Sequence, residues 1–321
     1  MNTKTKICTI GGGTGMPVIN EALVKAGFSG IKSIVTTFDN GGDTGRLITD
    51  ERGQILANSD YWRSLISLWK DGEQKKIWVD MLRYRDGRAR NFGNIFFQFM
   101  SEKSGSLADV DVLFKNLTLA DLKGEVIPIS LSPASICMET KSGKKYIGEH
   151  FLDDLRMSRD YVTKLWLDPK VEANPEAIEA MLNAEVIIVC PGSVYGSLIT
   201  NFLTKGICEA FTKSKAKKIL MVNIMSSANE GDVKNQNDYL NLYKKFLDID
   251  FDVLLMADLK KLDSSKLKKV MDFYDMENSE HIEYVEEANK NTVLTDIATI
   301  DEVNWRLRHS KLKLARFFAK M

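Results

Sequence analysis

A run of glycines near the start of the sequence is the sharpest feature that could bind a charged ligand. Residues 11–15 read Gly-Gly-Gly-Thr-Gly, follow the apolar run 7–10 and precede a helix-like pattern that stops at Gly27. Glycines let the backbone approach a ligand closely, and the N–H groups at a helix N-terminus attract phosphate oxygens. The run has neither the GxGxxG spacing nor the Gly-Lys pair of the Walker motif. The run can therefore be interpreted as a phosphate-binding loop or as a tight turn only. The candidate ligand contacts are Gly11, Gly12, Gly13, Thr14 and Gly15.

An acidic segment follows the next apolar run, 33–38, and reads Asp-Asn-Gly-Gly-Asp at 39–43. Because the carboxyl ends of parallel strands meet at one edge of a sheet, this segment is expected beside the glycine run. An acid in this place commonly accepts ribose hydroxyls, which suits Asp39. Alternatively Asp39, Asp43 and Asp60 hold a Mg²⁺ that bridges to a diphosphate, or all three are structural. Asp39 and Asp60 are the candidate catalytic residues, and the candidate ligand contacts are Asp39, Asn40, Gly41 and Gly42.

A second segment repeats the order of strand, turn and helix. The apolar run 186–190 leads into Pro-Gly-Ser at 191–193 and then into a helical pattern. The hydroxyls of Ser193 and Ser197 could meet a phosphate or a sugar, and the Tyr195 ring could stack on a base. The Asn223 amide, which donates and accepts, could read a uracil edge. An ordinary helix N-cap and a buried structural amide are the alternatives. The candidate contacts here are Pro191, Gly192, Ser193, Tyr195, Ser197 and Asn223.

The elements that must position these residues form an α/β pattern. Apolar runs at 7–10, 33–38, 126–131, 186–190, 219–225 and 252–256 mostly lack alternation, as expected for strands covered on both faces, and helical patterns separate them. This predicts a doubly wound, mainly parallel, Rossmann-like sheet. Residues 136–140 and 145–147 alternate about a Lys-Ser-Gly-Lys turn and predict a β-hairpin. We expect one large domain, 1–321, with a helical insertion or cap at about 52–123 and a C-terminal helical layer at about 258–321.

The composition limits the kinds of partner that the protein is expected to bind. The 44 lysines and arginines equal the 44 aspartates and glutamates, whereas a nucleic-acid polymer is normally met by a basic excess. The sequence has no run of about 18 apolar residues, so insertion into a membrane is not expected. The first residues do not resemble a leader segment. We expect a cytoplasmic protein with a small-molecule ligand, and a homodimer stays open. None of the three histidines has a partner that spacing identifies, so no histidine base is assigned.

Five motifs in order resemble the signatures of the CofD/YvcK family, which includes the gluconeogenesis factors and 2-phospho-L-lactate transferase. The resemblance extends from residue 6 to at least residue 232, and the ending Arg-His-Ser-Lys at 308–311 resembles the family's terminal helix. It adds Asn94 to the candidate contacts. The motifs are the glycine run, residues 39–47, Asn-Phe-Gly-Asn at 91–94, Pro-Gly-Ser-Val-Tyr at 191–195 with Ser197, and Asn-Ile-Met at 223–225 with Glu230.

The resemblance implies a nucleotide-binding α/β fold with its pocket over the carboxyl ends of the strands. In the gluconeogenesis-factor branch the implied ligand is a nucleotide sugar of the UDP-N-acetylglucosamine type, with a role in carbon metabolism and in cell-wall growth and cell shape. In the transferase branch a Mg²⁺-dependent enzyme of coenzyme F420 biosynthesis moves a phospholactyl group to a deazaflavin.

Two departures favour the binding branch over the transferase. The chain has Asp39-Asn40 where the family usually has two aspartates, and Ser-Asp-Tyr-Trp-Arg at 59–63 where it usually has Gly-Asp-Ile-Arg-Asn. Losing a charged ligand weakens a Mg²⁺ site. Backbone binding through the glycine run would survive that loss. We therefore expect a nucleotide or nucleotide-sugar ligand, with Mg²⁺ and turnover as open alternatives.

Overall fold

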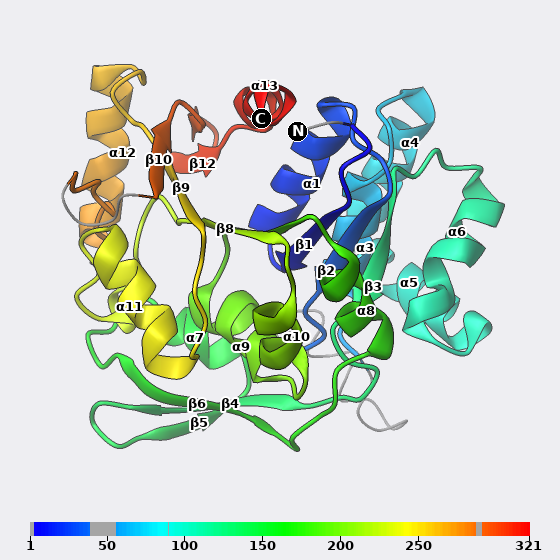
Figure 1. Ribbon diagram of the computed structural model, residues 1–321, viewed down its shortest axis with the longest axis horizontal. Coiled ribbons are helices and arrows are strands. Elements are labelled where there is room, and N and C mark those ends of the chain that lie inside the picture. The colour runs from blue at the N-terminus through cyan, green and yellow to red at the C-terminus, as the bar shows by residue number, and fades with distance from the viewer. Residues whose placement is uncertain (1–2, 39–55, 89, 287–290) are drawn as a thin grey trace.

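A seven-stranded sheet forms the centre of the computed structural model, which describes residues 3–38, 56–88, 90–286 and 291–321 (Figure 1). Its strands run parallel in the order β10-β9-β8-β7-β1-β2-β3. The expected doubly wound α/β sheet is thereby confirmed. The strands are β1 (Ile7–Gly11), β2 (Ile31–Val35), β3 (Gly124–Pro128), β7 (Val186–Val189), β8 (Lys217–Met221), β9 (Val253–Ala257) and β10 (Thr292–Thr295).

Each face of the sheet has its own hydrophobic core. Within β7, Ile187 and Val189 belong to one core while Val186 and Ile188 belong to the other, because successive side chains leave a strand on opposite faces. This explains the unbroken apolar runs. One core is closed by α1 (Gly15–Lys25), α12 (Ser264–Met276), α13 (Lys311–Lys320) and the helical insertion, and the other by α7 (His150–Leu155), α8 (Pro175–Asn183), α9 (Ile199–Leu203), α10 (Ile207–Lys213) and α11 (Gln236–Phe246).

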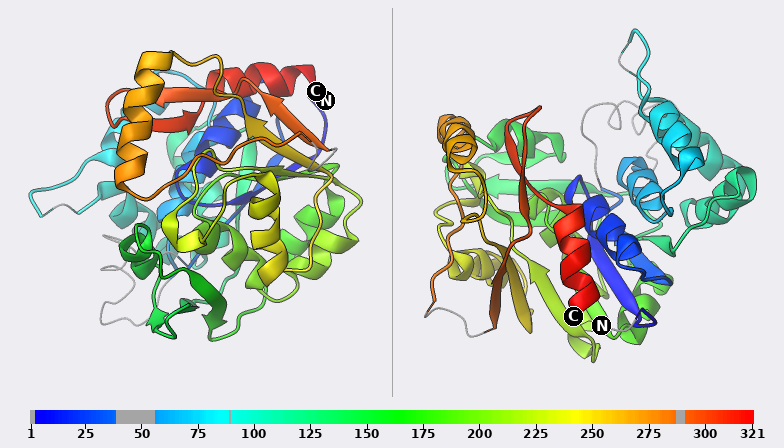
Figure 2. Two further views of the ribbon diagram at one scale, coloured as in Figure 1. Left: turned by 90° about the vertical axis from the view of Figure 1, so that its left-hand side faces the viewer. Right: turned by 90° about the horizontal axis from the view of Figure 1, so that it is seen from above.

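The helical stretch between β2 and β3 stands to one side of the sheet (Figure 2). Aromatic side chains hold it together. Phe97 and Phe114 have ring centroids 5.4 Å apart, and Trp62 stacks on Phe97 at 6.3 Å. Such rings bury a large area per residue and fix the packing of the helices. The helices in the described part of this stretch are α3 (Ser59–Ser67), α4 (Glu73–Arg83), α5 (Phe92–Ser104) and α6 (Val110–Thr118).

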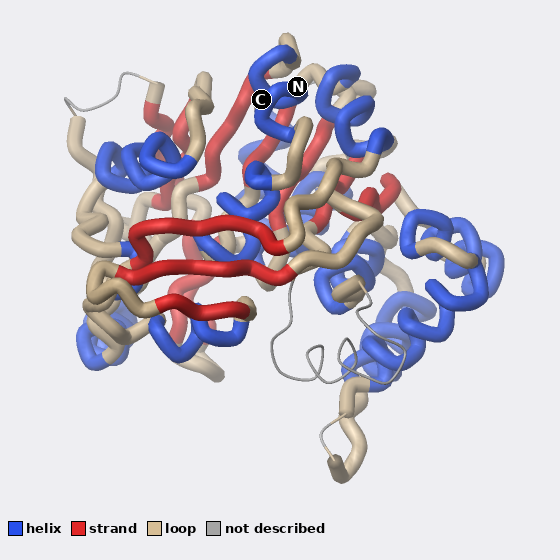
Figure 3. Tube along the Cα trace, turned by 90° about the horizontal axis from the view of Figure 1, so that it is seen from below, coloured by secondary structure: helices blue, strands red, loops and turns tan. Residues whose placement is uncertain are grey.

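A three-stranded antiparallel sheet lies below the main sheet in Figure 1 and faces the viewer in Figure 3. The predicted hairpin is present as β4 (Ser135–Thr140) and β5 (Lys145–Ile147). A third strand, β6 (Val162–Asp168), pairs with the other edge of β4 and was not expected from the sequence. It carries buried residues at Val162, Leu165 and Leu167, so the small sheet covers one side of the core.

The C-terminal part is more than the expected helical layer. Besides α12 and α13 it contains β10, which extends the main sheet, and a hairpin of β11 (Ala298–Asp301) and β12 (Arg306–His309). These strands are short and half-buried among charged residues, so their apolar signal is weak. Helix α13 lies beside α1 (Figures 1 and 2), where Lys311 pairs with Glu21 at 2.6 Å. Across the described residues, every helix is too short or too polar to cross a bilayer.

Candidate functional site

A cleft of about 570 Å³ opens over the carboxyl ends of β1, β7 and β8. From β1 the chain proceeds outward to β2 and β3, and from β7 it proceeds outward in the other direction. The strand order therefore reverses between β1 and β7. The loops after these two strands separate there, which is where α/β sheets of this kind bind ligands. Both glycine-containing turns of the sequence meet at this point.

The turn after β1 needs glycine for two different reasons. Gly13 has φ +63°, a left-handed conformation that is costly for other residues. A Cβ on Gly15 would lie 1.9 Å from the carbonyl oxygen of Pro191, so the two turns touch backbone to backbone. Gly13, Thr14 and Gly15 line the cleft. Gly11 lies within β1 and Gly12 is buried, and neither of these two predicted contacts lines the cleft.

Asp60 binds the glycine turn directly. The N–H of Gly13 donates to Asp60 Oδ2 at 2.7 Å, and Arg63 Nη1 lies 3.5 Å from Oδ1. The Asp60 side chain is only 4% exposed, and it lies in the first turn of α3, where the helix dipole stabilises an anion. This carboxylate thus occupies the Gly13 N–H that a phosphate was expected to use. An anionic ligand must bind through other donors of the cleft or displace it.

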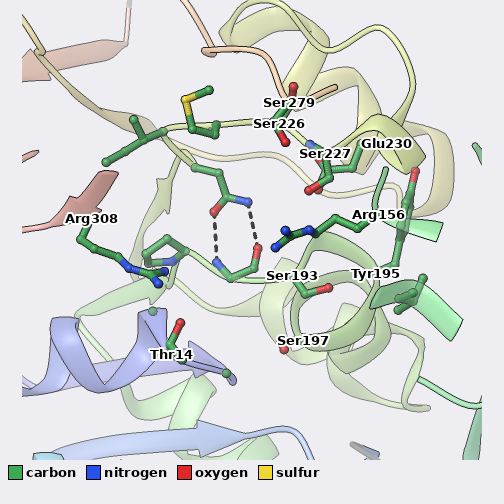
Figure 4. Close-up of a pocket in the computed structure, with 18 of the residues that line it drawn as sticks. Thr14, Arg156, Ser193, Tyr195, Ser197, Ser226, Ser227, Glu230, Ser279 and Arg308 are labelled. Atoms are coloured by element: carbon green, nitrogen blue, oxygen red, sulfur yellow. Dashed lines mark hydrogen bonds between the residues drawn. The ribbon is translucent and has the colours of Figure 1, made fainter. Parts of the chain in front are cut away.

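The turn after β7 is fixed by Asn223, which follows β8. Its Oδ1 accepts from the Gly192 N–H at 3.0 Å, and its Nδ2 donates to the Gly192 carbonyl at 2.8 Å (dashed lines in Figure 4). Asn223 lines the cleft, but these bonds give it a positioning role. Its predicted recognition of a uracil stays a prediction. Ser193 caps the following short π-helix, η2 (Val194–Leu198), by accepting from the Gly196 N–H at 3.2 Å.

Tyr195 and Glu230 form a buried end of the cleft. Tyr195 is 2% exposed, and its ring packs edge-on against Phe246. Its hydroxyl has no hydrogen-bond partner among the described residues. Base stacking by this ring stays a prediction. Glu230, 7% exposed, lies in the short helix η3 (Ala228–Glu230), and burial raises its pKa to about 8 although the Ser227 N–H donates to it.

Basic side chains reach the cleft from several elements. Arg156 and Arg308 approach the turn after β7 from opposite sides (Figure 4), while Arg63 and Arg85 lie with the glycine turn and the helical insertion. Arg156 Nη2 is 2.9 Å from Glu277, which also pairs with Arg306, so part of its charge is balanced.

The remaining predicted contacts divide into two groups. Asn94, Pro191, Gly192, Ser193 and Ser197 line the cleft with Asp60. Asn94 is held by the Trp62 indole N–H, which donates to its Oδ1 at 2.8 Å. Five predicted residues lie outside the described part of the chain, so the ribose and Mg²⁺ predictions that rest on them stay predictions: Asp39, Asn40, Gly41, Gly42 and Asp43.

The structure adds residues that were not candidate contacts. Glu230 and Arg308 stood within the quoted motifs, so a signal for them existed, whereas nothing in the sequence marked Arg156. His309 also lines the cleft, and burial lowers the pKa of its imidazole to about 4. It is therefore neutral near pH 7, and among the described residues its Nε2 has no hydrogen-bond partner.

Comparison with known proteins agrees with this architecture. The model of the family described as 2-phospho-L-lactate transferase CofD matches residues 7–303. A putative gluconeogenesis factor of Thermotoga maritima is 27% identical and covers 97% of both chains. The gluconeogenesis factor of Listeria innocua is 29% identical over 77% of this chain and 76% of its own. The crystal structure of a UPF0052 family member from Bacillus halodurans superposes with a TM-score of 0.84 at 25% identity and 98% coverage of each chain. With this match over nearly its whole length, the chain belongs to the CofD family.

Proposed function

We propose that this protein binds a nucleotide sugar of the UDP-N-acetylglucosamine type in the cleft, and that it acts as a gluconeogenesis factor in carbon metabolism and cell-wall or cell-shape regulation. The observation that carries the proposal is the meeting of the two turns at the switch point of the sheet. There Gly15 and Pro191 touch, and Arg156 and Arg308 approach from opposite sides. Turns of this kind and arginines are the groups that bind a diphosphate.

The size and lining of the cleft support a ligand larger than a phosphate. About 570 Å³ lies in the range of small-molecule sites, and the lining combines arginines with serines and backbone groups. Arginines suit the diphosphate and hydroxyls suit a sugar. The names of the Thermotoga and Listeria relatives support the metabolic role.

A transferase is the second candidate because the matching family model is described as one. In the stretch that departs from the family pattern, Tyr61 and Trp62 pack into the core of the helical insertion. Of this stretch Asp60 and Arg63 line the cleft. Fewer polar groups are then available for a metal or an acceptor, which favours binding without turnover.

Two measurements separate the candidates. Native mass spectrometry of the purified protein, before and after adding UDP-N-acetylglucosamine, should show a one-to-one complex. Incubation with Mg²⁺, a deazaflavin acceptor and a nucleotide-activated phospholactate donor should give no coupled product. Repeated product formation would establish the transferase instead, and the absence of any complex would refute the nucleotide-sugar proposal.

A further inference from the structure

The backbone at Arg156 is tied to two other parts of the fold. The Arg156 carbonyl oxygen accepts from the Ala228 N–H at 3.0 Å, and Ala228 begins η3 in the loop after β8. The next carbonyl along the chain, that of Met157, accepts from Asn278 Nδ2 at 3.2 Å, just past the end of α12. These bonds fix the point from which the Arg156 side chain enters the cleft.

The Arg156 side chain is held by Glu277, the residue that ends α12. Arg156 Nη2 donates to Glu277 Oε2 at 2.9 Å, and the other carboxylate oxygen, Oε1, accepts from Arg306 of β12. Arg156 and Glu277 line the cleft, whereas Arg306 does not. The Arg306 guanidinium carbon lies 5.3 Å from the centre of the Tyr274 ring. Arg306 therefore fixes the carboxylate that in turn orients Arg156.

The charges of this group favour an anion at Arg156. The Glu277 side chain is 18% exposed, but that of Arg156 is 44% exposed and its guanidinium points toward the turn after β7 (Figure 4). A guanidinium has more N–H donors than one carboxylate oxygen accepts, so donors remain for phosphate oxygens. Because one carboxylate faces two arginines, the group of three keeps a net positive charge.

Holding an arginine in place before the ligand arrives increases affinity. Ordering one long, flexible side chain during binding lowers affinity about two- to tenfold. The bond to Glu277 orders the Arg156 side chain in the free protein, so that this loss is avoided when a ligand binds.

We propose that Glu277 is a positioning residue that orients Arg156 for the diphosphate of the ligand. Arg156 bonds the phosphate oxygens directly, and Glu277, fixed by Arg306, acts only through Arg156. This rests on the proposed function, because it assigns the diphosphate of a nucleotide sugar to the Arg156 side of the cleft.

The test is a double-mutant cycle on the affinities for UDP-N-acetylglucosamine and for UDP, measured by calorimetry on the full chain in the presence of Mg²⁺. The variants are Arg156→Ala, Glu277→Ala and the double variant. Asp275→Ala is the matched control, because it removes an exposed carboxylate near the end of α12 that does not line the cleft. Circular dichroism confirms folding. If Glu277→Ala does not fold, Glu277→Met replaces it, since methionine keeps the length of the side chain without its oxygens.

We expect Arg156→Ala to weaken both ligands about tenfold or more, as for the loss of a charge-assisted hydrogen bond. Glu277→Ala should weaken both about two- to tenfold, because Arg156 must then be ordered during binding. In the Arg156→Ala background the loss of Glu277 should have no further effect. Asp275→Ala should bind both ligands like the parent.

Tighter binding by Glu277→Ala would mean that its carboxylate competes with the ligand for Arg156. Additive losses in the double variant would mean that Glu277 acts independently of Arg156. Either result, unchanged affinity in one of the single variants, or an effect on only one of the two ligands would overturn the inference and leave the proposed function intact. If the parent binds neither ligand, the proposed function fails and this inference fails with it.

Discussion

Replacing Glu230 by glutamine should change how the stability of the protein depends on pH. Burial raises the pKa of this carboxyl from its ordinary 4.5 to about 8. Below pH 4.5 both the folded and the unfolded state hold the proton. As the pH rises from 4.5 to 8 the unfolded state loses it while the folded state keeps it, so the free energy of unfolding falls over this window.

The magnitude follows from the size of the raised pKa. One pKa unit corresponds to about 1.4 kcal/mol, so between pH 5 and pH 8 the parent should lose on the order of 3 kcal/mol through Glu230. Glutamine does not titrate, yet its side-chain oxygen can still accept from the Ser227 N–H. The difference in unfolding free energy between Glu230→Gln and the parent should therefore shift by that amount in favour of the variant.

Urea denaturation at pH 5 and pH 8 measures this difference, and other titrating groups cancel between the two proteins. Glu280→Gln, the same substitution at an exposed position, is the control. If the difference in unfolding free energy between Glu230→Gln and the parent is the same at pH 5 and pH 8, the inference that Glu230 is a buried neutral acid is wrong.

Gly13→Val should abolish UDP-N-acetylglucosamine binding in a folded protein, because its side chain would occupy space at the wall of the cleft. The atom nearest to the new Cβ would be Ser197 Oγ, at 3.6 Å. Gly143→Val, at another positive-φ glycine that does not line the cleft, should bind normally, and calorimetry measures both affinities. Gly15→Ala should cost about 1–3 kcal/mol in thermal or urea unfolding, since its Cβ would overlap the Pro191 carbonyl; parent-like stability would show that the two turns do not touch. If Asp60 and Asp39 face the diphosphate, EDTA should weaken binding, and unchanged affinity would mean that these acids act without a metal.

Much of the fold was predictable because buried parallel strands have a strong sequence signal. The apolar runs of β1 and β7 fill two cores at once and could be identified directly. The strands β6 and β10–β12 could not, because β10 and β11 are short and only partly buried, and charged residues interrupt the apolar ones in β6 and β12. Their pairing depends on tertiary contacts that the local sequence does not encode.

The site was predictable to the extent that it depends on backbone turns. Gly13, Gly15 and Gly192 lie at the cleft because strand, turn and helix follow one another in the sequence. Side chains that reach the cleft from distant elements were harder to find. Arg156 follows a short helix and carries no local signature, and the bond of Asp60 to the Gly13 N–H joins residues 47 positions apart.

Hydrogen–deuterium exchange with and without UDP-N-acetylglucosamine tests the central claim most directly, because it reports both binding and its location. The account predicts slower exchange in peptides that cover residues 12–18 and 191–198, the two turns of the cleft. Exchange at the second cavity, of about 580 Å³ and lined by Lys32, Glu125 and Glu176, should not change. Unchanged exchange at both turns, or protection confined to that second cavity, would contradict the claim that the cleft over β1 and β7 binds the nucleotide sugar.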